Sequence, residues 1–277
     1  MKFEMWSFWH ILYMISPFII FAGIYFFIRN KSKKEKENLG IILGVISILT
    51  LVVRNVDIFI RDGWDLEVIP LQVCHIGSLI AGLALITKKK WLISTAFCFN
   101  IIPAFLAMLI ADALANYDTI LKIRAQSYIW GHIFIIVCAL YGVMVYLPKL
   151  TKKDLVKSLV FVGSMAIVAI ICNSAFRAIL GWESNYFYLY NYEGTPLKFL
   201  YNIVPSSTYG WFTINLFYVI SLLAFFVLVF IGMFVVSNII VNKLSKGVSR
   251  FEVKDNVVIK AKSNDNKQID LEVTSDN

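Results

Sequence analysis

The sequence predicts an all-α polytopic membrane protein with seven transmembrane helices, and both its composition and the placement of its lysines indicate this class. Of the 277 residues, 59% are hydrophobic and 16% are charged, and the mean hydropathy is +0.73. A soluble domain is less apolar than this. A helix of about 20 apolar residues crosses a hydrocarbon core about 30 Å thick with every backbone group bonded internally. Apolar runs of this length therefore predict membrane-spanning helices.

Seven apolar runs alternate with basic and non-basic loops. The predicted spans are 7–28, 39–60, 66–87, 91–111, 127–147, 158–180 and 209–240. Clusters of lysine and arginine at 29–36, 88–90, 149–157 and 243–250 follow the first, third, fifth and seventh spans. By the positive-inside rule these clusters are cytoplasmic, which predicts a cell-membrane protein with its N-terminus outside and its C-terminus in the cytoplasm.

The seven spans make one transmembrane domain, residues 1–245. A polar cytoplasmic tail, 246–277, follows, and we expect it to be disordered because its short alternating stretches bury too little apolar surface. Most of the net charge of +8 comes from the cytoplasmic lysines. The charge therefore argues against a nucleic-acid partner.

The first two spans each carry polar residues. His10 lies in the first span. In the second, Arg54, Asp57 and Arg61 fall on one face of a helix, so Asp57 is expected to pair with either arginine. Such a pair either holds an arginine toward a polar cavity or is a structural ion pair near the interface.

The third span has the most polar sequence, with Glu67, Gln72, Cys74, His75 and Ser78. As one continuous helix it places Glu67, Cys74 and Ser78 on one stripe and turns His75 about 100° away from Cys74. Cys74 would then lie about two turns from the outer end. The other cysteines lie inside spans without a Cys-x-x-Cys spacing, and we interpret them as buried thiols.

The fourth and fifth spans add a bend and a second histidine. Asn100 and Pro103 are expected to bend the fourth helix, and Asp112 follows its outer end. The fifth span starts outside and carries His132 near its beginning. Because the third span also starts outside, His132 and Cys74 are predicted to lie at similar depths.

The sixth span and the loop after it complete the polar set. Asn173 and Arg177 lie one helical turn apart, where the guanidinium either binds a lipid phosphate or extends to the outer interface. The loop 181–211 contains Asn185 and Tyr186 and is rich in tyrosine and tryptophan. We interpret it as a lid over the site or as an aromatic belt at the membrane interface.

These polar side chains come from six segments and fall near the same predicted membrane face. Ionisable groups in hydrocarbon are costly unless they pair or line a polar cavity, so we expect a shared site in the outer half of the membrane. A Cys74–His132 dyad fits this placement, with the thiolate attacking an acyl carbonyl while the imidazole takes and returns the proton. The alternatives that spacing alone leaves open are a buried structural thiol for Cys74 and an interhelical hydrogen-bonded core histidine for His132.

Several motifs together resemble a known family. PLQVC at 70–74, WGHIFIIVCALYG at 130–142, NYFYL at 185–189 and TPLKFLYNIVP at 195–205 resemble the bacterial YwaF-type integral membrane proteins and their eukaryotic relative, transmembrane protein 164. That family has seven helices, a Pro-Leu-His-x-Cys motif in the third, a His-Gly-type motif in the fifth and an Asn-Tyr loop before the seventh. The resemblance covers spans three to seven, and His10 resembles a first-helix histidine of the family.

The resemblance implies a cysteine acyltransferase that moves a fatty acyl chain between phospholipids through an acyl-cysteine intermediate. Cys74 would be the nucleophile and His132 the acid/base. The supporting set is His10, Arg54, Asp57, Gln72, His75, Asn173, Arg177, Asn185 and Tyr186. Two positions depart from the family pattern, because Gln72 replaces a histidine and residues 205–209 replace a Trp-Pro repeat.

Membrane phospholipids are therefore the expected substrates, and no cofactor or metal is expected. The competing hypothesis is a transporter or ligand-binding seven-helix protein in which Arg54, Asp57, Arg177 and the histidines bind a polar solute. A scaffold without chemistry is a third possibility.

Overall fold

A computed structural model describes residues 3–193 and 195–246, and most of the chain there is helical. Seven of the described helices are long and apolar enough to cross a membrane, which confirms the predicted all-α, seven-helix class of multi-pass membrane protein. The spans are α1 (Phe8–Ile28), α2 (Lys33–Asp62), η1 (Leu66–Val68) with α3 (Val73–Thr87), α4 (Lys90–Thr95) with η2 (Ala96–Asn100) and α5 (Ile101–Leu109), α7 (Ile123–Met144), α8 (Lys152–Leu180) and α10 (Leu216–Leu244). The predicted tail lies outside the described residues from position 247 onward.

Two helices, α2 and α8, begin six residues earlier than the apolar runs predict. α2 starts at Lys33 because Ser32 and Glu35 form a capping box. α8 starts at Lys152 for the same reason, with Thr151 and Asp154 as the box. Polar first turns carry too little hydropathy to be assigned to a span, although the capping residues are visible in the sequence.

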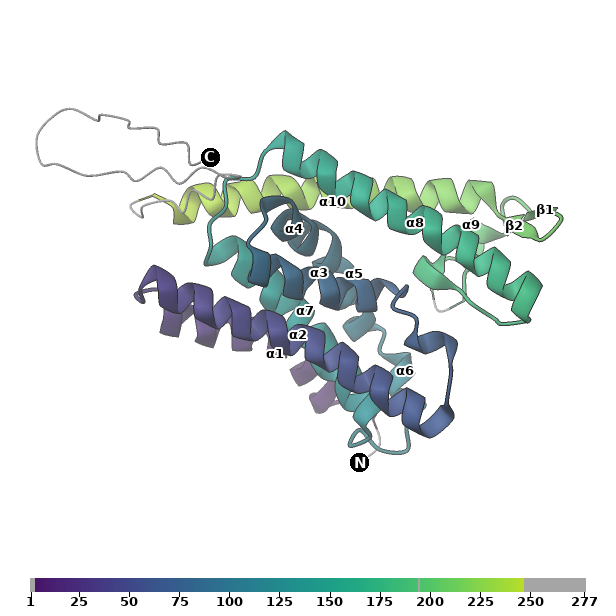
Figure 1. Cartoon of the computed structure of the whole chain (residues 1–277), viewed down its shortest axis with the longest axis horizontal. Helices are drawn as coiled ribbons and strands as arrows, with labels where there is room; N and C mark the ends of the chain where they lie inside the picture. The colour runs from purple at the N-terminus through teal and green to yellow at the C-terminus, as the bar shows by residue number, and fades with distance from the viewer. Residues whose placement is uncertain (1–2, 194, 247–277) are drawn as a thin grey trace, which may run out of the picture.

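The loop before α10 is more structured than expected. It contains η3 (Tyr186–Tyr188), the short helix α9 (Lys198–Tyr201) and an antiparallel hairpin of β1 (Ser207–Tyr209) and β2 (Phe212–Ile214). Gly210, with φ +62°, supplies the left-handed turn between the strands. The hairpin delays the start of α10 from the predicted 209 to Leu216. We call the end of the bundle where α2 ends, α8 ends and α10 begins the hairpin end (Figure 1).

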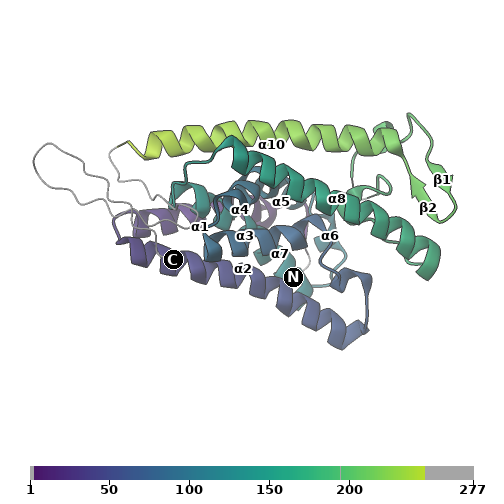
Figure 2. The ribbon, with the colours of Figure 1, turned by 45° about the horizontal axis from the view of Figure 1, so that its top comes forward.

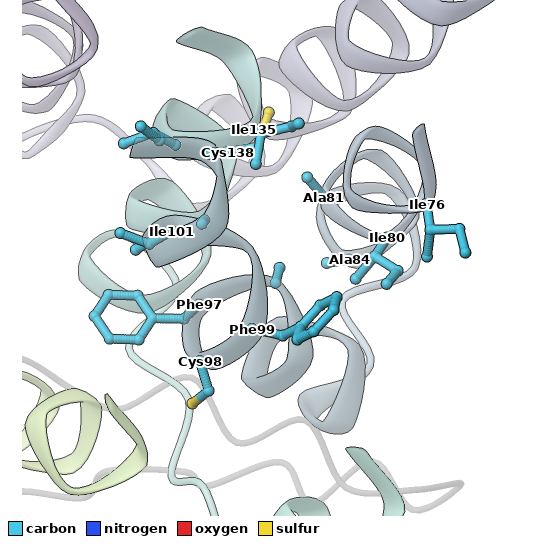
Figure 3. Close-up of a cluster of buried hydrophobic side chains, with 14 of the residues drawn as sticks. Ile76, Ile80, Ala81, Ala84, Phe97, Cys98, Phe99, Ile101, Ile135 and Cys138 are labelled. Carbon is cyan, nitrogen blue, oxygen red and sulfur yellow. The ribbon is translucent and has the colours of Figure 1, made fainter. Parts of the chain in front are cut away.

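Helix α7 lies at the centre and packs against α1, α2, α3 and α5. In Figures 1 and 2, α8 and α10 lie along one side of the bundle and α1 and α2 along the other. The core between α3, η2, α5 and α7 consists of fully or nearly fully buried apolar side chains, among them Ile80, Ala84, Phe97 and Ile135 (Figure 3).

Helices α2 and α3 approach closely at a pair of glycines. A Cβ atom added to Gly82 would lie 2.6 Å from the carbonyl oxygen of Gly44, and one added to Gly44 would lie 2.7 Å from that of Gly82. Near this contact the Ser47 hydroxyl donates to the Ser78 carbonyl at 3.1 Å. Small residues of this kind allow membrane helices to pack backbone to backbone.

The fourth span is interrupted where Asn100 and Pro103 predict a bend. Residues Ala96–Asn100 form a π turn, and the Asn100 side-chain amide donates to the Gly77 carbonyl at 3.0 Å. Proline at 103 cannot donate a backbone hydrogen bond to Phe99, so the regular helical ladder is broken at this point.

Candidate functional site

Cys74 lies at the start of a helix, in contrast to the continuous span predicted from residue 66. After the 3₁₀ turn at Leu66–Val68 the chain turns through Pro70, and α3 begins only at Val73. The predicted stripe joining Glu67 to Cys74 is therefore wrong, because Glu67 belongs to a separate turn. Pro70 lacks an N–H and disfavours helical geometry in the residue before it, which delays the helix.

This placement suits a reactive thiol. Cys74 is the second residue of α3, where the first backbone N–H groups have no partner within the helix. The positive end of a helix stabilises a thiolate in that position.

Cys74 and His132 line one cavity of about 40 Å³ between α2, α3 and α7. The cavity has room for a few water molecules. It is lined by Thr50, Leu51, Arg54, Cys74, His75, Ser78, Ser127, Tyr128, Gly131, His132 and Ile135. The structure thus brings together the two residues predicted to form a dyad, although their catalytic role stays a prediction.

The tautomer of His132 follows from its hydrogen bond. Its Nδ1 lies 2.7 Å from the Tyr128 carbonyl oxygen, one turn earlier in α7. A carbonyl only accepts hydrogen bonds, so Nδ1 carries the proton and Nε2 keeps a lone pair. Nε2 bonds to no described residue. His132 therefore has the form that a general base requires.

His75 and Arg54 line the same cavity. His75 is buried and lines the cavity together with His132, so the two histidines are near each other. Arg54 pairs with Glu67 at 2.5 Å and donates to the Glu67 carbonyl at 2.9 Å. The guanidinium is thereby held at the cavity that Cys74 also lines.

Asp57 also forms ion pairs, but its partners are not those of Arg54. Its carboxylate accepts from Arg61 at 2.7 Å and lies 4.0 Å from Arg124 of α7, which also pairs with Asp62. Of the two pairings predicted for Asp57, only that with Arg61 is present. The network ties the end of α2 to the start of α7 and lies outside the cavity lining.

The sixth span and its loop form a second cluster, separate from the cavity lining. The Asn173 amide donates to the Tyr186 carbonyl at 3.0 Å and accepts from its N–H at 2.7 Å. Arg177 donates to the Ser184 carbonyl at 2.8 Å and lies over the Tyr190 ring at 4.1 Å. Through these contacts Asn173 and Arg177 hold the loop onto α8.

Asn185 and Tyr186 add further contacts that hold this loop in place. We call the contacts of Asn173, Asn185 and Tyr186 the loop clamp. The side-chain amide oxygen of Asn185 accepts from the N–H groups of Tyr190 and Asn191 at 3.1 and 3.3 Å. The Tyr186 hydroxyl donates to the Leu66 carbonyl at 3.0 Å, which ties the loop to the turn preceding α3. These residues therefore position the loop near Cys74 without lining the cavity.

The remaining predicted residues lie apart from the cavity. His10 is fully buried and has both nitrogens engaged, since Nε2 donates to the Met108 carbonyl at 2.8 Å and Nδ1 accepts from the Trp6 N–H at 2.9 Å. Gln72 precedes α3 without a side-chain capping bond, and Asp112 is exposed at the start of α6 (Asp112–Ala115). No group of three or more potential metal ligands occurs among the described residues.

The pKa values of two tyrosines outside the spans show how burial and nearby charges act around the site. Burial raises the pKa of the Tyr188 phenol above its usual value, and the nearby Cys74 raises it further. Burial also raises the pKa of Tyr117, followed by the negative charge of Glu67. Both phenols stay neutral at physiological pH and can donate hydrogen bonds.

The comparison with protein families gives one result. The model of the TMEM164 family matches residues 5–234. The chain belongs to the TMEM164 family. The match confirms the resemblance drawn from the motifs and extends it to the first two spans. Neither the curated proteins nor the solved structures contain a significant match.

For this TMEM164-family chain, the sequence alone did not point to three polar residues of the cavity lining. Thr50, Ser127 and Tyr128 line the cavity beside the predicted residues. The sequence does indicate two of them, because Ser127 and Tyr128 precede His132 by five and four residues on the same helix, which is close to one helical turn. For Thr50 no local signal exists, since hydroxyl residues are common in membrane helices.

Proposed function

We propose that the protein is a membrane acyltransferase that moves a fatty acyl chain between phospholipids and lysophospholipids through a thioester on Cys74. One observation carries the proposal: the cavity is lined both by a cysteine at a helix N-terminus and by a histidine whose Nε2 is unprotonated. Membership of the TMEM164 family also supports the proposal.

The reaction follows from these two groups. His132 Nε2 takes the proton of the Cys74 thiol as the sulfur attacks the ester carbonyl carbon of a phospholipid. The ester C–O bond then breaks, and His132 returns the proton to the departing lysophospholipid oxygen. A second lysophospholipid hydroxyl reverses these steps, loses its proton to His132 and takes the acyl group from the sulfur.

The size of the cavity limits what enters it. A space of about 40 Å³ holds the reacting carboxyl group but no fatty chain. The acyl chain would therefore lie along the apolar outer faces of the helices, where Leu49, Val53 and Val56 of α2 are exposed. Exposed apolar side chains on a spanning helix contact lipid, so the substrate is already at the surface it needs.

The orientation is part of the proposal. With the N-terminus outside and the C-terminus in the cytoplasm, as the lysine clusters predict, the hairpin end faces outward. ATP and acyl-coenzyme A are not present there, so a membrane phospholipid would be the acyl donor.

The structure gives less support to a transporter. The charged residues predicted to bind a solute do not converge, because Arg54 pairs with Glu67, Asp57 with Arg61, and Arg177 contacts the loop. Only Arg54 among them lines the cavity.

The test is the intact mass of purified protein after incubation with phosphatidylcholine or phosphatidylethanolamine vesicles. Wild type is compared with Cys74→Ala, with His132→Asn and with the control Cys172→Ala, which removes another half-buried thiol. Asparagine at 132 can keep the hydrogen bond to the Tyr128 carbonyl while removing the base.

We expect a hydroxylamine-sensitive fatty-acyl adduct in wild type and in Cys172→Ala. The adduct should be absent in Cys74→Ala and should form at least tenfold more slowly in His132→Asn. An adduct that survives Cys74→Ala, or no adduct with either vesicle, would refute acyl transfer through Cys74.

A further inference from the structure

Ser78 of α3 has a side-chain hydroxyl that makes no hydrogen bond within the described part of the chain. The residue lines the cavity that holds Cys74 and His132, and it is only 4% exposed. Its backbone carbonyl accepts from the Ser47 hydroxyl, but its own hydroxyl has no partner. A buried polar group without a partner costs free energy, so this hydroxyl calls for an explanation.

The other buried serines and threonines of the described helices have partners. Ser158 and Thr95 donate to the backbone carbonyl four residues earlier in their own helices, a common arrangement for hydroxyl residues in helices. The remaining four, which bond within their own helix or to another segment, are Ser47, Ser94, Ser174 and Ser237. The Cys74 carbonyl, four residues before Ser78, offers the same bond, but the Ser78 hydroxyl does not form it. The hydroxyl is therefore available to a group that enters the cavity.

The position of Ser78 on α3 places this hydroxyl beside the thiol. Residues four apart in a helix differ in direction by only about 40°, so Ser78 lies on the same face as Cys74, one turn further along. Helical side chains lean toward the N-terminus, which directs the Ser78 side chain at the turn that carries Cys74. Nδ1 of His75 is a second buried atom of the lining without a partner. Consecutive helical residues point about 100° apart, however, so His75 faces away from the thiol.

The spacing of Cys74 and Ser78 suits one oxygen atom between their side chains. Cβ atoms one helical turn apart are separated by about 5–6 Å. An oxygen joined to the Cys74 sulfur through one carbon atom could then accept a hydrogen bond of about 2.7–2.8 Å from the Ser78 hydroxyl.

Gly131 of α7 leaves room for such an oxygen. A Cβ atom added to Gly131 would meet no atom within 4 Å, although this glycine is buried and lines the cavity. At the buried glycines Gly77 and Gly142 of α3 and α7, an added Cβ would lie 3.4 and 3.1 Å from a neighbouring side chain. Glycine destabilises a helix, so a buried glycine that no neighbour requires indicates that the space in front of it is used.

Attack on an ester creates a negative oxygen that needs a hydrogen-bond donor. Donors fixed where this charge develops make a large contribution to acyl-transfer rates, most of all where water is excluded. Ser78 meets both conditions, because it is buried and its hydroxyl has no other partner.

We infer that Ser78 is a catalytic residue whose hydroxyl donates a hydrogen bond to the carbonyl oxygen of the ester attacked by Cys74. As the sulfur–carbon bond forms, the carbonyl electron pair moves to this oxygen, and Ser78 binds it without giving up its proton. When the ester C–O bond breaks, the pair returns to form the thioester carbonyl. The inference rests on the proposed acyl transfer.

The test uses Ser78→Ala, which removes the hydroxyl and keeps a small side chain between α2 and α3. Acylation of Cys74 is measured by intact mass with phosphatidylcholine vesicles and, separately, with p-nitrophenyl butyrate, because both form a negative oxygen. Alkylation of Cys74 by iodoacetamide forms none and reports thiol access. Ser221→Ala in α10 is a control outside the cavity lining, and Ser127→Ala is a control for a half-buried serine within it.

Ser78→Ala should acylate Cys74 about 100-fold more slowly than wild type with either ester, the loss expected for one missing donor. Iodoacetamide should alkylate it at the wild-type rate, and both controls should match wild type in the two assays. Acylation of Ser78→Ala at the wild-type rate would overturn the inference. An equal loss of acylation and alkylation would also overturn it, because Ser78 would then only keep the thiol accessible. A larger loss in Ser127→Ala than in Ser78→Ala would move the donor to α7.

Stability gives a second check. Ser78→Ala should melt no lower than wild type, because it removes a buried hydroxyl that has no partner. A lower melting temperature would show that the hydroxyl is already bonded in the resting protein, which would remove the basis of the inference.

The two esters separate this inference from the proposed function. If vesicles give no adduct with wild type, phospholipid acyl transfer fails, while p-nitrophenyl butyrate still decides whether Ser78 assists attack by Cys74. If vesicles acylate wild type and Ser78→Ala alike, acyl transfer stands and the role of Ser78 fails.

Discussion

Replacing Gly82 by alanine should separate α2 from α3 and destabilise the protein. The new Cβ would lie 2.6 Å from the Gly44 carbonyl oxygen and 2.6 Å from Ile48 Cγ1. Ordinary contacts begin near 3.4 Å, so the helices must move apart by about 0.8 Å. Overpacking of this kind costs about 1–3 kcal/mol. The backbone oxygen cannot rotate away as a side chain would, so repacking does not relieve the contact.

The control is Gly23→Ala in α1, where an added Cβ meets no atom within 4 Å. Both variants gain the same helix propensity, about 1 kcal/mol, so the difference between them isolates the contact. We expect Gly82→Ala to unfold more easily than Gly23→Ala by about 1–3 kcal/mol in a detergent titration. Equal stability of the two variants would refute the close approach.

Gly82→Ala should also widen the cavity, because residues of both α2 and α3 line it. Separation would break the bond from Ser47 to the Ser78 carbonyl and open the space beside Cys74. A membrane-permeant maleimide should then label Cys74 faster. In the double variant with Gly44→Ala the stability losses should be less than additive, because the helices are already apart. Strict additivity would indicate that the two glycines do not share one contact.

Two further predictions concern the loop clamp and the charge beside the thiol. Asn173→Leu should cost about 1–3 kcal/mol, because it leaves the buried N–H of Tyr186 without a partner, whereas the Tyr186 carbonyl still accepts from the Leu189 N–H. The substitution should also expose the loop to limited proteolysis, and an uncleaved loop would contradict the clamp. Arg54→Met should slow maleimide labelling of Cys74 at neutral pH about tenfold, or about 1.4 kcal/mol, whereas Arg61→Met should leave the rate unchanged. Equal effects of the two arginine variants would show that the charge of Arg54 does not act on the thiol.

The sequence predicts the helices well and the site in part. Apolar runs and lysine clusters suffice for seven spans because length and hydropathy decide membrane insertion. The pairing of Cys74 with His132 in one cavity follows from similar depths in two spans that start on the same side. This prediction needs only the rise per residue of a helix and the side of the membrane on which each span starts.

What the sequence leaves open depends on tertiary contacts. The break before Cys74 was signalled by Pro70, but hydropathy alone extended the helix across it. The role of Asn173 depends on a loop residue 13 positions later. The partner of Arg54 is Glu67 of η1, and only the chain reversal after α2 brings that residue within reach.

The late start of α3 has a consequence for the surrounding bilayer. From Cys74 to Lys88, which marks the far interface, is roughly 21 Å at 1.5 Å per residue. In a hydrocarbon layer of about 30 Å the thiol is then roughly 9 Å beneath the opposite surface. Bilayers adapt to a short hydrophobic segment by thinning locally, at a modest cost for each ångström. Thinning is therefore expected beside α3 alone, because α2, α8 and α10 have 30, 29 and 29 residues and are long enough to cross the full layer. Such a local depression lowers lipid glycerol groups toward Cys74.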